Sequence, residues 1–466
     1  MKRLPLSLIA HWAGGRLHGE DTVVDAIGND SRAMRPGSLY LALRGERFDG
    51  HDFAASALAN GASALLVSHL LDAEAPQIVV DDVQLALARI AAAMQRGRAT
   101  RVVAITGSNG KTSVKTLVLA ILGRVGEVYA NPGNRNNEIG LPLAVIEAPD
   151  EAPFAVYEMG AGKPGDIAYL TDIAPPFASL VNNIAPAHLE RMGSLLGIAR
   201  TKGAIYAALP AGGTAVVNAD DAFAPWFEQE LIRPDASGRT LLRFGLEASA
   251  EVTARDIVDE AEGSRFVLVT PQGEAPVRLR LPGHHNVRNA LAAASLALAC
   301  GVAPADIAAG LGEAQPVAGR QAAHRLGNGA VLIDDSYNAN PGSLGAAIDT
   351  LAAMPGEGWL VLGDMRELGP EAAALHAEAG RRAKAAGLAR LYALGELSAA
   401  AASAFGDGAR LFETHDALAA ALRADLDLAA AGGQAIHCLV KGSRGSAMDR
   451  IVDALLAQEE TASHVA

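Results

Sequence analysis

Short β-rich runs alternate with helical patterns in two separate series along this chain, and this alternation restricts the fold more than any other feature of the sequence. In the first series, β-type runs at 102–106, 154–159 and 178–184 are separated by helical patterns, among them 111–122. Strands that alternate with helices are typical of a parallel sheet with crossover helices. The middle of the chain is therefore predicted to be an α/β domain.

The second series begins near Ala330 and predicts a separate, doubly wound domain of the Rossmann type. Its expected strands are separated by Ala-rich helical stretches and lie at 331–334, 359–363, 390–394 and 436–440. Between the two series the sequence at 214–280 is more irregular, and an Ala-rich helix follows Asn289. A stretch with glycine and proline at 310–319 then predicts a linker near Pro316.

The first 83 or so residues form a block of mixed strand-like and helical patterns, which is closed by a helical pattern at 84–96. With roughly 150 residues per domain as a prior, a chain of 466 residues is expected to have about three domains. We therefore predict an α/β protein with a mixed N-terminal domain over 1–83, a central parallel-sheet domain over 84–315 and a C-terminal doubly wound domain over 316–466.

The composition restricts the possible partners. Half of the residues are hydrophobic, which excludes a disordered chain. Aromatic residues make up only 4% and the formal net charge is -13, so the chain lacks the features of a nucleic-acid-binding surface, and we expect small-molecule partners and no nucleic acid. The two cysteines, Cys300 and Cys438, lie in apolar stretches without metal-ligand spacing, so both are expected to be buried and reduced.

The N-terminus superficially resembles a secretory signal, because Lys2 and Arg3 precede an apolar run at 4–10. That run is short, and His11 and Trp12 follow it without a clear cleavage site. No apolar run approaches the roughly 20 residues needed to cross a bilayer. The protein is therefore expected to be cytoplasmic and not embedded in a membrane.

The strongest local motif is a glycine-rich loop between the predicted strand at 102–106 and the predicted helix at 111–122. It consists of Gly107, Ser108, Asn109, Gly110, Lys111, Thr112 and Ser113. Glycines let the backbone approach phosphates, helix N-terminal amides attract them, Lys111 would neutralise the terminal phosphate, and the Thr112 hydroxyl can ligate Mg²⁺. The general pattern has a further glycine where this chain has Ile105, which implies a shortened loop. The alternative is an ordinary strand-to-helix turn, but the Lys-Thr pair favours a P-loop ATPase-like domain with ATP and Mg²⁺ as cofactors.

Three further side chains are candidate metal ligands, each with an ordinary alternative. Glu158 stands at the carboxyl end of a predicted parallel strand, where a carboxylate suits Mg²⁺, although a glutamate at a strand end is often simply solvated. His188, after the strand at 178–184, is either a second ligand or a surface histidine. Lys202, in the helical stretch 195–209, is either a surface lysine or an amine of depressed pKa that reacts with CO₂ to give a metal-binding carbamate.

Taken in chain order, these motifs resemble the Mur ligase family, the ATP-dependent amide ligases of peptidoglycan precursor synthesis. The resemblance extends over nearly the whole chain. It is carried by the segments at 106–112, 133–137, 157–160, 182–190, 283–290, 319–320 and 441–444. Ser108 and His284 depart mildly from the family pattern, and neither departure removes a proposed ligand.

The resemblance implies a role for each residue that matches a family motif. Lys111 and Thr112 would hold the γ-phosphate and Mg²⁺, and Glu158 would bind the first Mg²⁺ ion. A second Mg²⁺ would be bound by His188 and carbamylated Lys202. Asn289 would contact the adenine of ATP, Arg320 the γ-phosphate and Asp335 the ribose. The implied catalytic set is Lys111, His188, Lys202 and Arg320.

Within the family, the segments at 332–343 and 363–369 resemble the member that adds the D-alanyl-D-alanine dipeptide to a UDP-linked tripeptide. The Asp-Asn-Pro-Arg sequence expected of the tripeptide-forming member is absent. Turns at 29–32, 36–40 and 48–51 resemble the family's UDP-sugar-binding domain. The substrates would be UDP-N-acetylmuramoyl-tripeptide and D-alanyl-D-alanine, in contact with Ser31, Arg32, Asn134, Asn137, Tyr337 and Asn338.

The implied reaction forms an amide through an acyl phosphate and is the last cytoplasmic step of UDP-muramoyl-pentapeptide synthesis. The enzyme is expected to be a monomer whose C-terminal domain closes over ATP. One rival is another ligase of the superfamily, which adds glutamate to folate or an amino acid to a different precursor. The UDP-type N-terminal block argues against folate. A rival of another class is a P-loop kinase or a nucleotide-gated binding protein.

Overall fold

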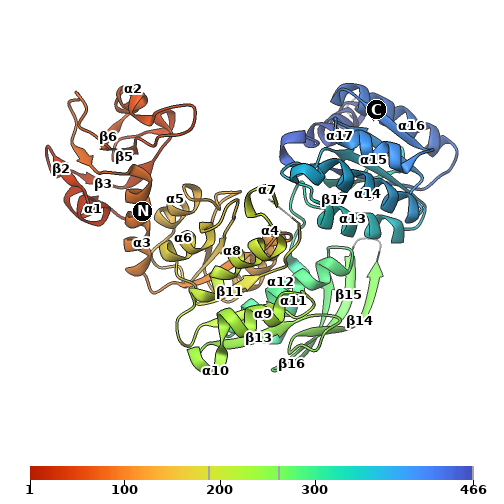
Figure 1. Ribbon diagram of the computed structural model, residues 1–466, viewed down its shortest axis with the longest axis horizontal. Coiled ribbons are helices and arrows are strands. Elements are labelled where there is room, and N and C mark those ends of the chain that lie inside the picture. Colours follow the sequence, from red (N-terminus) through yellow and green to blue (C-terminus); the bar gives the residue numbers. More distant parts are fainter. Residues whose placement is uncertain (187–188, 261–262, 464–466) are drawn as a thin grey trace.

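The computed structural model describes residues 1–186, 189–260 and 263–463, and these fold into three α/β lobes in chain order (Figure 1). The N-terminal and C-terminal lobes lie at opposite ends of the view in Figure 1, and the central lobe lies between them. Each lobe is built around its own larger sheet. The predicted α/β class with three sheet-containing parts is confirmed.

The N-terminal lobe contains a five-stranded sheet in the order β2-β7-β6-β5-β4. The four strands from β4 to β7 are parallel, and β2 at the edge is antiparallel to β7. A short antiparallel pair, β1 (Leu4–Pro5) and β3 (Val23–Val24), lies beside it. The other elements are α1 (Leu6–Ala13), β2 (Arg16–His18), β4 (Ala26–Gly28), β5 (Ser38–Leu41), α2 (Ala54–Ala59), β6 (Ala62–Val67) and β7 (Gln77–Val79).

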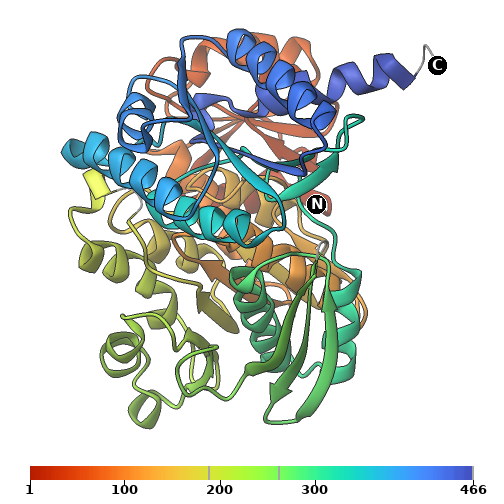
Figure 2. The same ribbon diagram turned by 90° about the vertical axis from the view of Figure 1, so that its right-hand side faces the viewer.

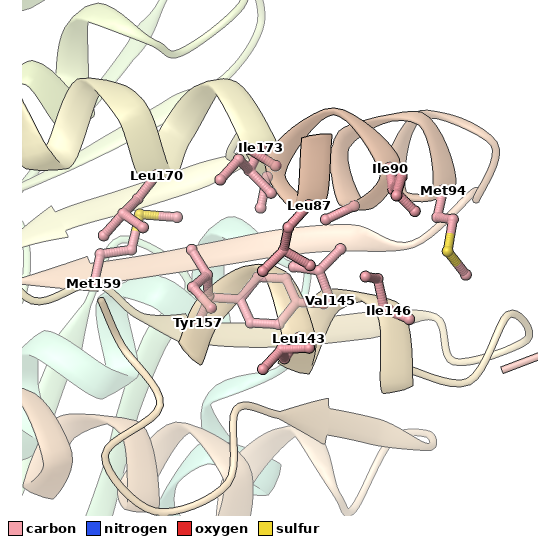
Figure 3. Packing of buried hydrophobic residues seen from close by; sticks show 14 of the residues in the cluster. Leu87, Ile90, Met94, Leu143, Val145, Ile146, Tyr157, Met159, Leu170 and Ile173 are labelled. Carbon is pink, nitrogen blue, oxygen red and sulfur yellow. The ribbon is translucent and has the colours of Figure 1, made fainter. Parts of the chain in front are cut away.

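Helix α3 (Val83–Arg96) joins the N-terminal lobe to the central lobe, and the Asp82 side chain caps its start by accepting from the Leu85 amide at 2.9 Å. Its apolar face, with Leu87 and Ile90, packs on α5 (Gly140–Glu147) and on the Tyr157 ring (Figure 3). The same hydrophobic cluster continues into α1 of the N-terminal lobe. Burial of α3 on both sides therefore holds the first two lobes together.

The central lobe is a six-stranded, all-parallel sheet in the order β13-β12-β11-β8-β10-β9. Separate hydrophobic clusters cover its two faces. Its strands are β8 (Arg101–Thr106), β9 (Val128–Ala130), β10 (Phe154–Glu158), β11 (Ala178–Val181), β12 (Thr214–Asn218) and β13 (Thr240–Phe244). Its further helices are α4 (Lys111–Leu122), α6 (Asp166–Ile173), α7 (Leu189–Met192), α8 (Leu195–Ala207), α9 (Ala224–Trp226), α10 (Pro234–Ser237), α11 (His284–Ala299) and α12 (Pro304–Glu313).

The predicted parallel sheet, its strands at 102–106 and 154–159 and the helix at 111–122 are confirmed. Strand β11 ends at Val181, earlier than expected, because Asn182 and Asn183 turn toward the glycine-rich loop and bond to it. Helix α11 begins at His284 and so includes the Ala-rich stretch after Asn289.

The prediction that 214–280 is irregular is wrong. After β12 and β13, this region forms an antiparallel three-stranded sheet of β14 (Thr253–Glu260), β15 (Gly263–Thr270) and β16 (Gly273–Leu279). Only alternate residues of β16 are buried, so its hydrophobic content is diluted by polar positions. A register irregularity, with Asp256 at a φ of 54°, interrupts the period of β14. The irregularity breaks the period-2 pattern of β14, whereas the alternating burial of β16 is the pattern of a strand with one solvated face.

The C-terminal lobe is a six-stranded sheet in the order β17-β18-β22-β19-β20-β21, and only the edge strand β17 is antiparallel. Helices cover both faces of this sheet (Figure 2), and a separate hydrophobic cluster lies on each face, so the lobe is doubly wound, as predicted. Its strands are β17 (Ala322–Arg325), β18 (Val331–Asp335), β19 (Glu357–Gly363), β20 (Arg390–Leu394), β21 (Ala409–Phe412) and β22 (Ile436–Lys441). Its helices are α13 (Pro341–Ala353), α14 (Ala372–Ala385), α15 (Ser398–Phe405), α16 (His415–Ala431) and α17 (Asp449–Ser463).

The two cysteines are buried and free, as expected. Burial raises the pKa of the Cys300 thiol to about 11 and that of Cys438 to about 12, so both stay protonated and unreactive at neutral pH. None of the described helices is both long and apolar enough to cross a membrane.

The packing of α12 on α4 predicts a stability difference between two glycines of one helix. A Cβ atom at Gly310 would lie 2.6 Å from the Cα of Ile121, whereas a Cβ at Gly312 would lie 3.4 Å from its nearest neighbour, the Arg278 carbonyl oxygen. We expect Gly310→Ala to lower the free energy of unfolding by about 1–3 kcal/mol through overpacking. Gly312→Ala should leave it unchanged or raise it by up to about 1 kcal/mol. Urea denaturation of both variants checks this, and equal effects would contradict the close packing.

Candidate functional site

A cavity of about 980 Å³ lies between the central and C-terminal lobes, at the carboxyl ends of β8, β10 and β11, where open α/β sheets bind their ligands. The predicted site residues that line it are Ser108, Asn109, Gly110, Lys111, Thr112, Ser113, Asn134, Asn137, Glu158, Asn289, Arg320, Asp335, Tyr337 and Asn338. The N-terminal lobe contributes Glu46. His188 lies outside the described residues.

The backbone of the glycine-rich loop requires glycine at two positions. Gly107 has a φ of 146° and Gly110 a φ of 76°, a left-handed range that other residues rarely adopt. A Cβ at Gly110 would lie 2.5 Å from the Asn182 Nδ2 and 2.6 Å from the Asn289 Oδ1. The loop therefore turns from β8 into α4 in a space that no larger residue fits.

Two asparagines after β11 hold the loop in place. The Asn183 Oδ1 accepts from the Asn109 amide at 2.9 Å, and the Asn182 Nδ2 donates to the Asn109 carbonyl at 3.0 Å. The Ser108 hydroxyl donates to the Ala185 carbonyl at 2.9 Å. The role of Asn182 and Asn183 was not predicted from the sequence. Two adjacent asparagines at the carboxyl end of a parallel strand could have indicated it, because ligand sites of α/β sheets lie there.

Lys111 is the first residue of α4, and its ammonium group lies against the loop. The Lys111 Nζ donates to the Gly107 carbonyl at 2.8 Å. Burial lowers the pKa of Lys111, the nearby Glu158 carboxylate opposes that shift, and the Arg320 charge adds to it. The loop thus has a desolvated cation that is held against its carbonyl groups.

The Glu158 carboxylate is the centre of the site and is only 3% exposed. It accepts from the Thr112 hydroxyl at 2.7 Å and from the Asn136 side-chain amide at 2.8 Å. Burial alone would raise the pKa of Glu158, but the charges of Lys111 and Lys115 together with the Thr112 bond outweigh it and hold the pKa below its usual value. Glu158 is therefore an ionised, buried carboxylate, and the solvated alternative is excluded.

Lys115 and Asn136 are functional candidates that sequence reasoning missed. The Lys115 Nζ lies 3.7 Å from the Glu158 Oε2 and donates to the carbonyls of Asn131 at 3.1 Å and Gly133 at 3.2 Å. Lys115 thereby fixes the loop after β9 beside the carboxylate. The available signal was its position, since a lysine four residues after Lys111 lies on the same face of a helix.

The oxygen atoms of Thr112 and Glu158 fit a magnesium ion. Among the described residues no group of three or more His, Cys, Asp or Glu side chains is arranged to hold a metal by itself. Mg²⁺ is usually held by one or two carboxylates together with substrate phosphates. A single ionised carboxylate beside a hydroxyl, where the glycine-rich loop ends and α4 begins, matches that donor set.

Lys202 on α8 is 1% exposed, so the surface alternative for this lysine is wrong. Burial lowers the pKa of Lys202 well below its usual value, and the nearby Lys111 charge lowers it further. A lowered pKa favours the neutral, nucleophilic form of an amine. Lys202 itself does not line the cavity described above.

Asn289 on α11 lies beside the turn at Gly110 and is 7% exposed. Its Oδ1 accepts from the Asn182 Nδ2 at 3.0 Å. One turn earlier, the His285 Nε2 and the Asn286 Nδ2 contact the Gln321 Oε1 at 2.8 and 3.0 Å. The start of α11 thus supports the loop on one side and holds the linker to the C-terminal lobe on the other.

Arg320 reaches the site from the linker. Its guanidinium lies over the Tyr337 ring at 4.2 Å from the ring centroid, and its charge influences both Lys111 and Glu158. The preceding Gly319 has a φ of 75°, donates its amide to the Asp334 Oδ2 at 2.9 Å and accepts from the Tyr337 amide at 3.1 Å. The linker is therefore tied to the end of β18.

Asp335 and Asn338 follow the same strand end. The Asp335 Oδ2 accepts from the Lys441 Nζ at 2.6 Å, and the Lys441 Nζ also donates to the Asn338 carbonyl at 3.0 Å. Lys441 is 3% exposed and ends β22. Lys441 belongs to the segment at 441–444 that carries the family resemblance, but that segment alone does not predict its contacts with Asp335 and Asn338.

Ser31 and Arg32 lie apart from this cavity, in a single 3-10 turn of the N-terminal lobe (Ser31–Ala33). Arg32 is exposed and pairs with Asp30 at 2.9 Å. Asn134 and Asn137 line the cavity, and the Asn137 Oδ1 also caps α5 by accepting from the Gly140 amide at 2.8 Å. The fold therefore brings the predicted nucleotide and C-terminal residues together and leaves the predicted uridine contacts in a separate lobe.

Models of three Mur ligase domains match this chain: the catalytic domain of the Mur ligase family over residues 23–95, the middle domain over 105–297 and the glutamate ligase domain over 319–444. The chain is 44% identical to the UDP-N-acetylmuramoyl-tripeptide--D-alanyl-D-alanine ligase of Escherichia coli K12, over 98% of this chain and 99% of that protein. The chain belongs to the Mur ligase family. The family resemblance deduced from the motifs is thereby confirmed.

Solved structures of similar Mur ligases have the same arrangement. The MurF structure from Acinetobacter baumannii superposes with a TM-score of 0.92 at 33% identity and covers 98% of this chain and 99% of its own. The MurF ligase from Thermotoga maritima, whose structure is a complex with ADP, superposes with a TM-score of 0.84 at 27% identity, over 94% of this chain and 98% of its own. The three-lobed fold of this Mur ligase is therefore the fold of those enzymes.

The role of Lys115 predicts a stability difference between this lysine, which is buried beside Glu158, and Lys163 at the cavity surface. Lys115→Met leaves two carbonyl oxygens without their donor and removes a cation from the buried Glu158 carboxylate, so we expect a loss of about 2–4 kcal/mol in the free energy of unfolding. Lys163, which is exposed and also lines the cavity, is the matched control, and Lys163→Met should change stability by less than about 0.5 kcal/mol. Denaturant titration of both variants measures this, and similar midpoints would contradict the bracing role.

Proposed function

We propose that this chain is an ATP-dependent ligase that joins D-alanyl-D-alanine to UDP-N-acetylmuramoyl-tripeptide in peptidoglycan precursor synthesis. The observation that carries the proposal is the match along the full length to enzymes of this name, at 44% identity for the Escherichia coli protein. The geometry supports it, because the phosphate loop faces the segment after β18 across one cavity. An ATP site and an amine-substrate site in one cleft are what such a ligation needs.

The chemistry must first make a carboxylate a good electrophile. The terminal carboxylate oxygen of the tripeptide attacks the γ-phosphorus of ATP, the bond to ADP breaks, and an acyl phosphate forms. The dipeptide amine then attacks the acyl carbon, the tetrahedral intermediate expels phosphate, and the nitrogen loses a proton. No protein nucleophile takes part, so the enzyme acts by positioning and by charge stabilisation.

Lys111 and Arg320 supply the positive charge for phosphoryl transfer. The Lys111 ammonium would exchange its bonds to the loop carbonyls for phosphate oxygens, and Arg320, stacked on Tyr337, would approach from the other lobe. The amides of Gly107 to Ser113 would hold the phosphates at the start of α4. Asn289 would contact the adenine, and Asp335 would accept from the ribose.

Thr112 and Glu158 would hold Mg²⁺ beside the phosphates, as their donor atoms fit this ion. When bound, the ion would neutralise charge on the phosphate oxygens. The family resemblance adds His188 and a Lys202 carbamate as ligands of a second ion. Asn136 and Lys115 would keep the Glu158 carboxylate oriented toward the phosphates.

The substrates would contact both outer lobes. We assign Ser31 and Arg32 to the uridine nucleotide, Asn134 and Asn137 to the tripeptide arm, and Tyr337 and Asn338 to the dipeptide.

Since one chain already brings the loop, the linker and the segment after β18 together, a monomer suffices for this cavity. We place the reaction in the cytoplasm, in keeping with the free, buried cysteines.

The buried Lys202 amine leads to a prediction about CO₂. Because burial and Lys111 depress its pKa, the neutral amine should react with CO₂ to give a carbamate near neutral pH. We expect turnover to fall when the assay is stripped of CO₂ and to return with bicarbonate. Carbon-13 NMR with labelled bicarbonate should detect a carbamate signal that Lys202→Arg lacks; the same signal in both proteins would exclude Lys202 as its source.

The ligase reaction itself is tested by phosphate release. With ATP, Mg²⁺, UDP-N-acetylmuramoyl-tripeptide and D-alanyl-D-alanine, steady release of phosphate should depend on both substrates, and the product should be the UDP-linked pentapeptide. Lys111→Ala is the negative control, and its turnover should be lost while the N-terminal lobe still binds the UDP substrate. Phosphate release that is independent of the dipeptide would instead favour a kinase or a nucleotide-gated binding protein.

A further inference from the structure

One side-chain hydrogen bond joins the phosphate loop directly to the C-terminal lobe. The Asn340 Nδ2 donates to the Asn109 Oδ1 at 2.6 Å, between residues 231 positions apart in the chain. Asn340 is 9% exposed, so this bond is shielded from solvent. It connects the element that would hold ATP to the lobe that would hold the dipeptide.

Asn340 makes this contact with only one end of its amide, because the other end caps a helix. The Asn340 Oδ1 accepts from the Ser343 amide at 2.9 Å, as the N-cap of α13. The first turn of α13 also packs on the central lobe: a Cβ at Gly342 would lie 3.3 Å from the Ala185 Cβ and 3.4 Å from the Asn109 Nδ2. The start of α13 therefore packs on the loop and is aligned by Asn340.

Asn109 is in turn held rigidly by its own lobe. Its amide donates to the Asn183 Oδ1, and its carbonyl accepts from the side chains of Asn182 at 3.0 Å and Asn183 at 3.2 Å. With the backbone of Asn109 fixed at three points, its side chain follows any movement of the loop. A change at the loop is thus transmitted to the start of α13 through this hydrogen bond and the packing at Gly342.

We propose that Asn340 is a positioning residue that sets the segment from Asp335 to Ser343 against the phosphate loop, so that the dipeptide amine is presented to the acyl phosphate. This inference rests on the proposed function. Tyr337 and Asn338 precede Asn340 on the same short connection from β18 to α13, so an error in the position of α13 moves them as well. Asn340 itself takes no part in bond formation.

Asn340→Ser separates positioning from helix stability. Serine caps a helix nearly as well as asparagine, but its hydroxyl is too short to reach Asn109. We expect kcat/KM for D-alanyl-D-alanine to fall about 3- to 10-fold, the effect of one hydrogen bond, with little change in KM for the UDP substrate and in Tm. Unchanged kcat/KM for the dipeptide would overturn the proposal.

Thr414→Ala is the matched control, because it removes the N-cap of α16 in the same lobe and leaves Asn340 intact. It should lower Tm without a selective loss in dipeptide kinetics. The same dipeptide loss in Thr414→Ala as in Asn340→Ser would overturn the proposal, since a general weakening of the lobe would then explain both.

A double-mutant cycle with Asn109→Ala tests the bond from the other side and does not disturb the cap of α13. If the two side chains act through each other, Asn340→Ser should cause no further loss of kcat/KM in the Asn109→Ala background. Equal losses in both backgrounds would overturn the proposal. Failure of the proposed function is distinct from either result, because the wild-type enzyme would then show no dipeptide-dependent phosphate release.

Discussion

The buried carboxylate of Glu158 is the interaction on which the rest of the site depends. An ionised group that is 3% exposed is stable only if its charge is compensated, and Lys111, Lys115, Thr112 and Asn136 together provide that compensation. Each of these partners also has a structural task, since they belong to the loop, to α4 and to the loop after β9. Satisfying one charge therefore fixes three segments around the place where phosphates would bind.

A second constraint comes from the direction of the strands. The carboxyl ends of β10 and β11 face the carboxyl ends of β18 and β22 across a cavity, so side chains from distant parts of the chain meet there. Two C-terminal residues act on the glycine-rich loop and its surroundings, Arg320 through its charge and Asn340 through a hydrogen bond to Asn109. A site divided in this way is complete only when the two lobes are correctly oriented.

Much of the fold could be predicted, because the inner strands are continuous apolar runs that alternate with helices. The edge strands β17 and β21 and the sheet of β14 to β16 were missed. Strands β17 and β21 contain no fully buried residue, a register irregularity interrupts β14, and Pro276 lies within β16. Among site residues, the glycine-rich loop and Glu158 could be recognised from local motifs. Asn136 and Lys441 lie in segments that carry the family resemblance, but their roles, like that of Lys115, depend on contacts with residues elsewhere in the chain.

By itself, the sequence determined the class of chemistry. A strand, a glycine turn and a Lys-Thr pair at the head of a helix specify phosphate binding, because the backbone geometry that phosphates require is encoded within a few adjacent residues. Tertiary structure decided which ionisable groups are buried and paired. Glu158 is buried and ionised rather than exposed to solvent, and Lys202 is buried rather than on the surface. Both outcomes depend on desolvation and on neighbouring charges, which come from residues that only the folded chain brings together. The bond from Asn340 to Asn109 is of the same kind, since it exists only where two lobes meet.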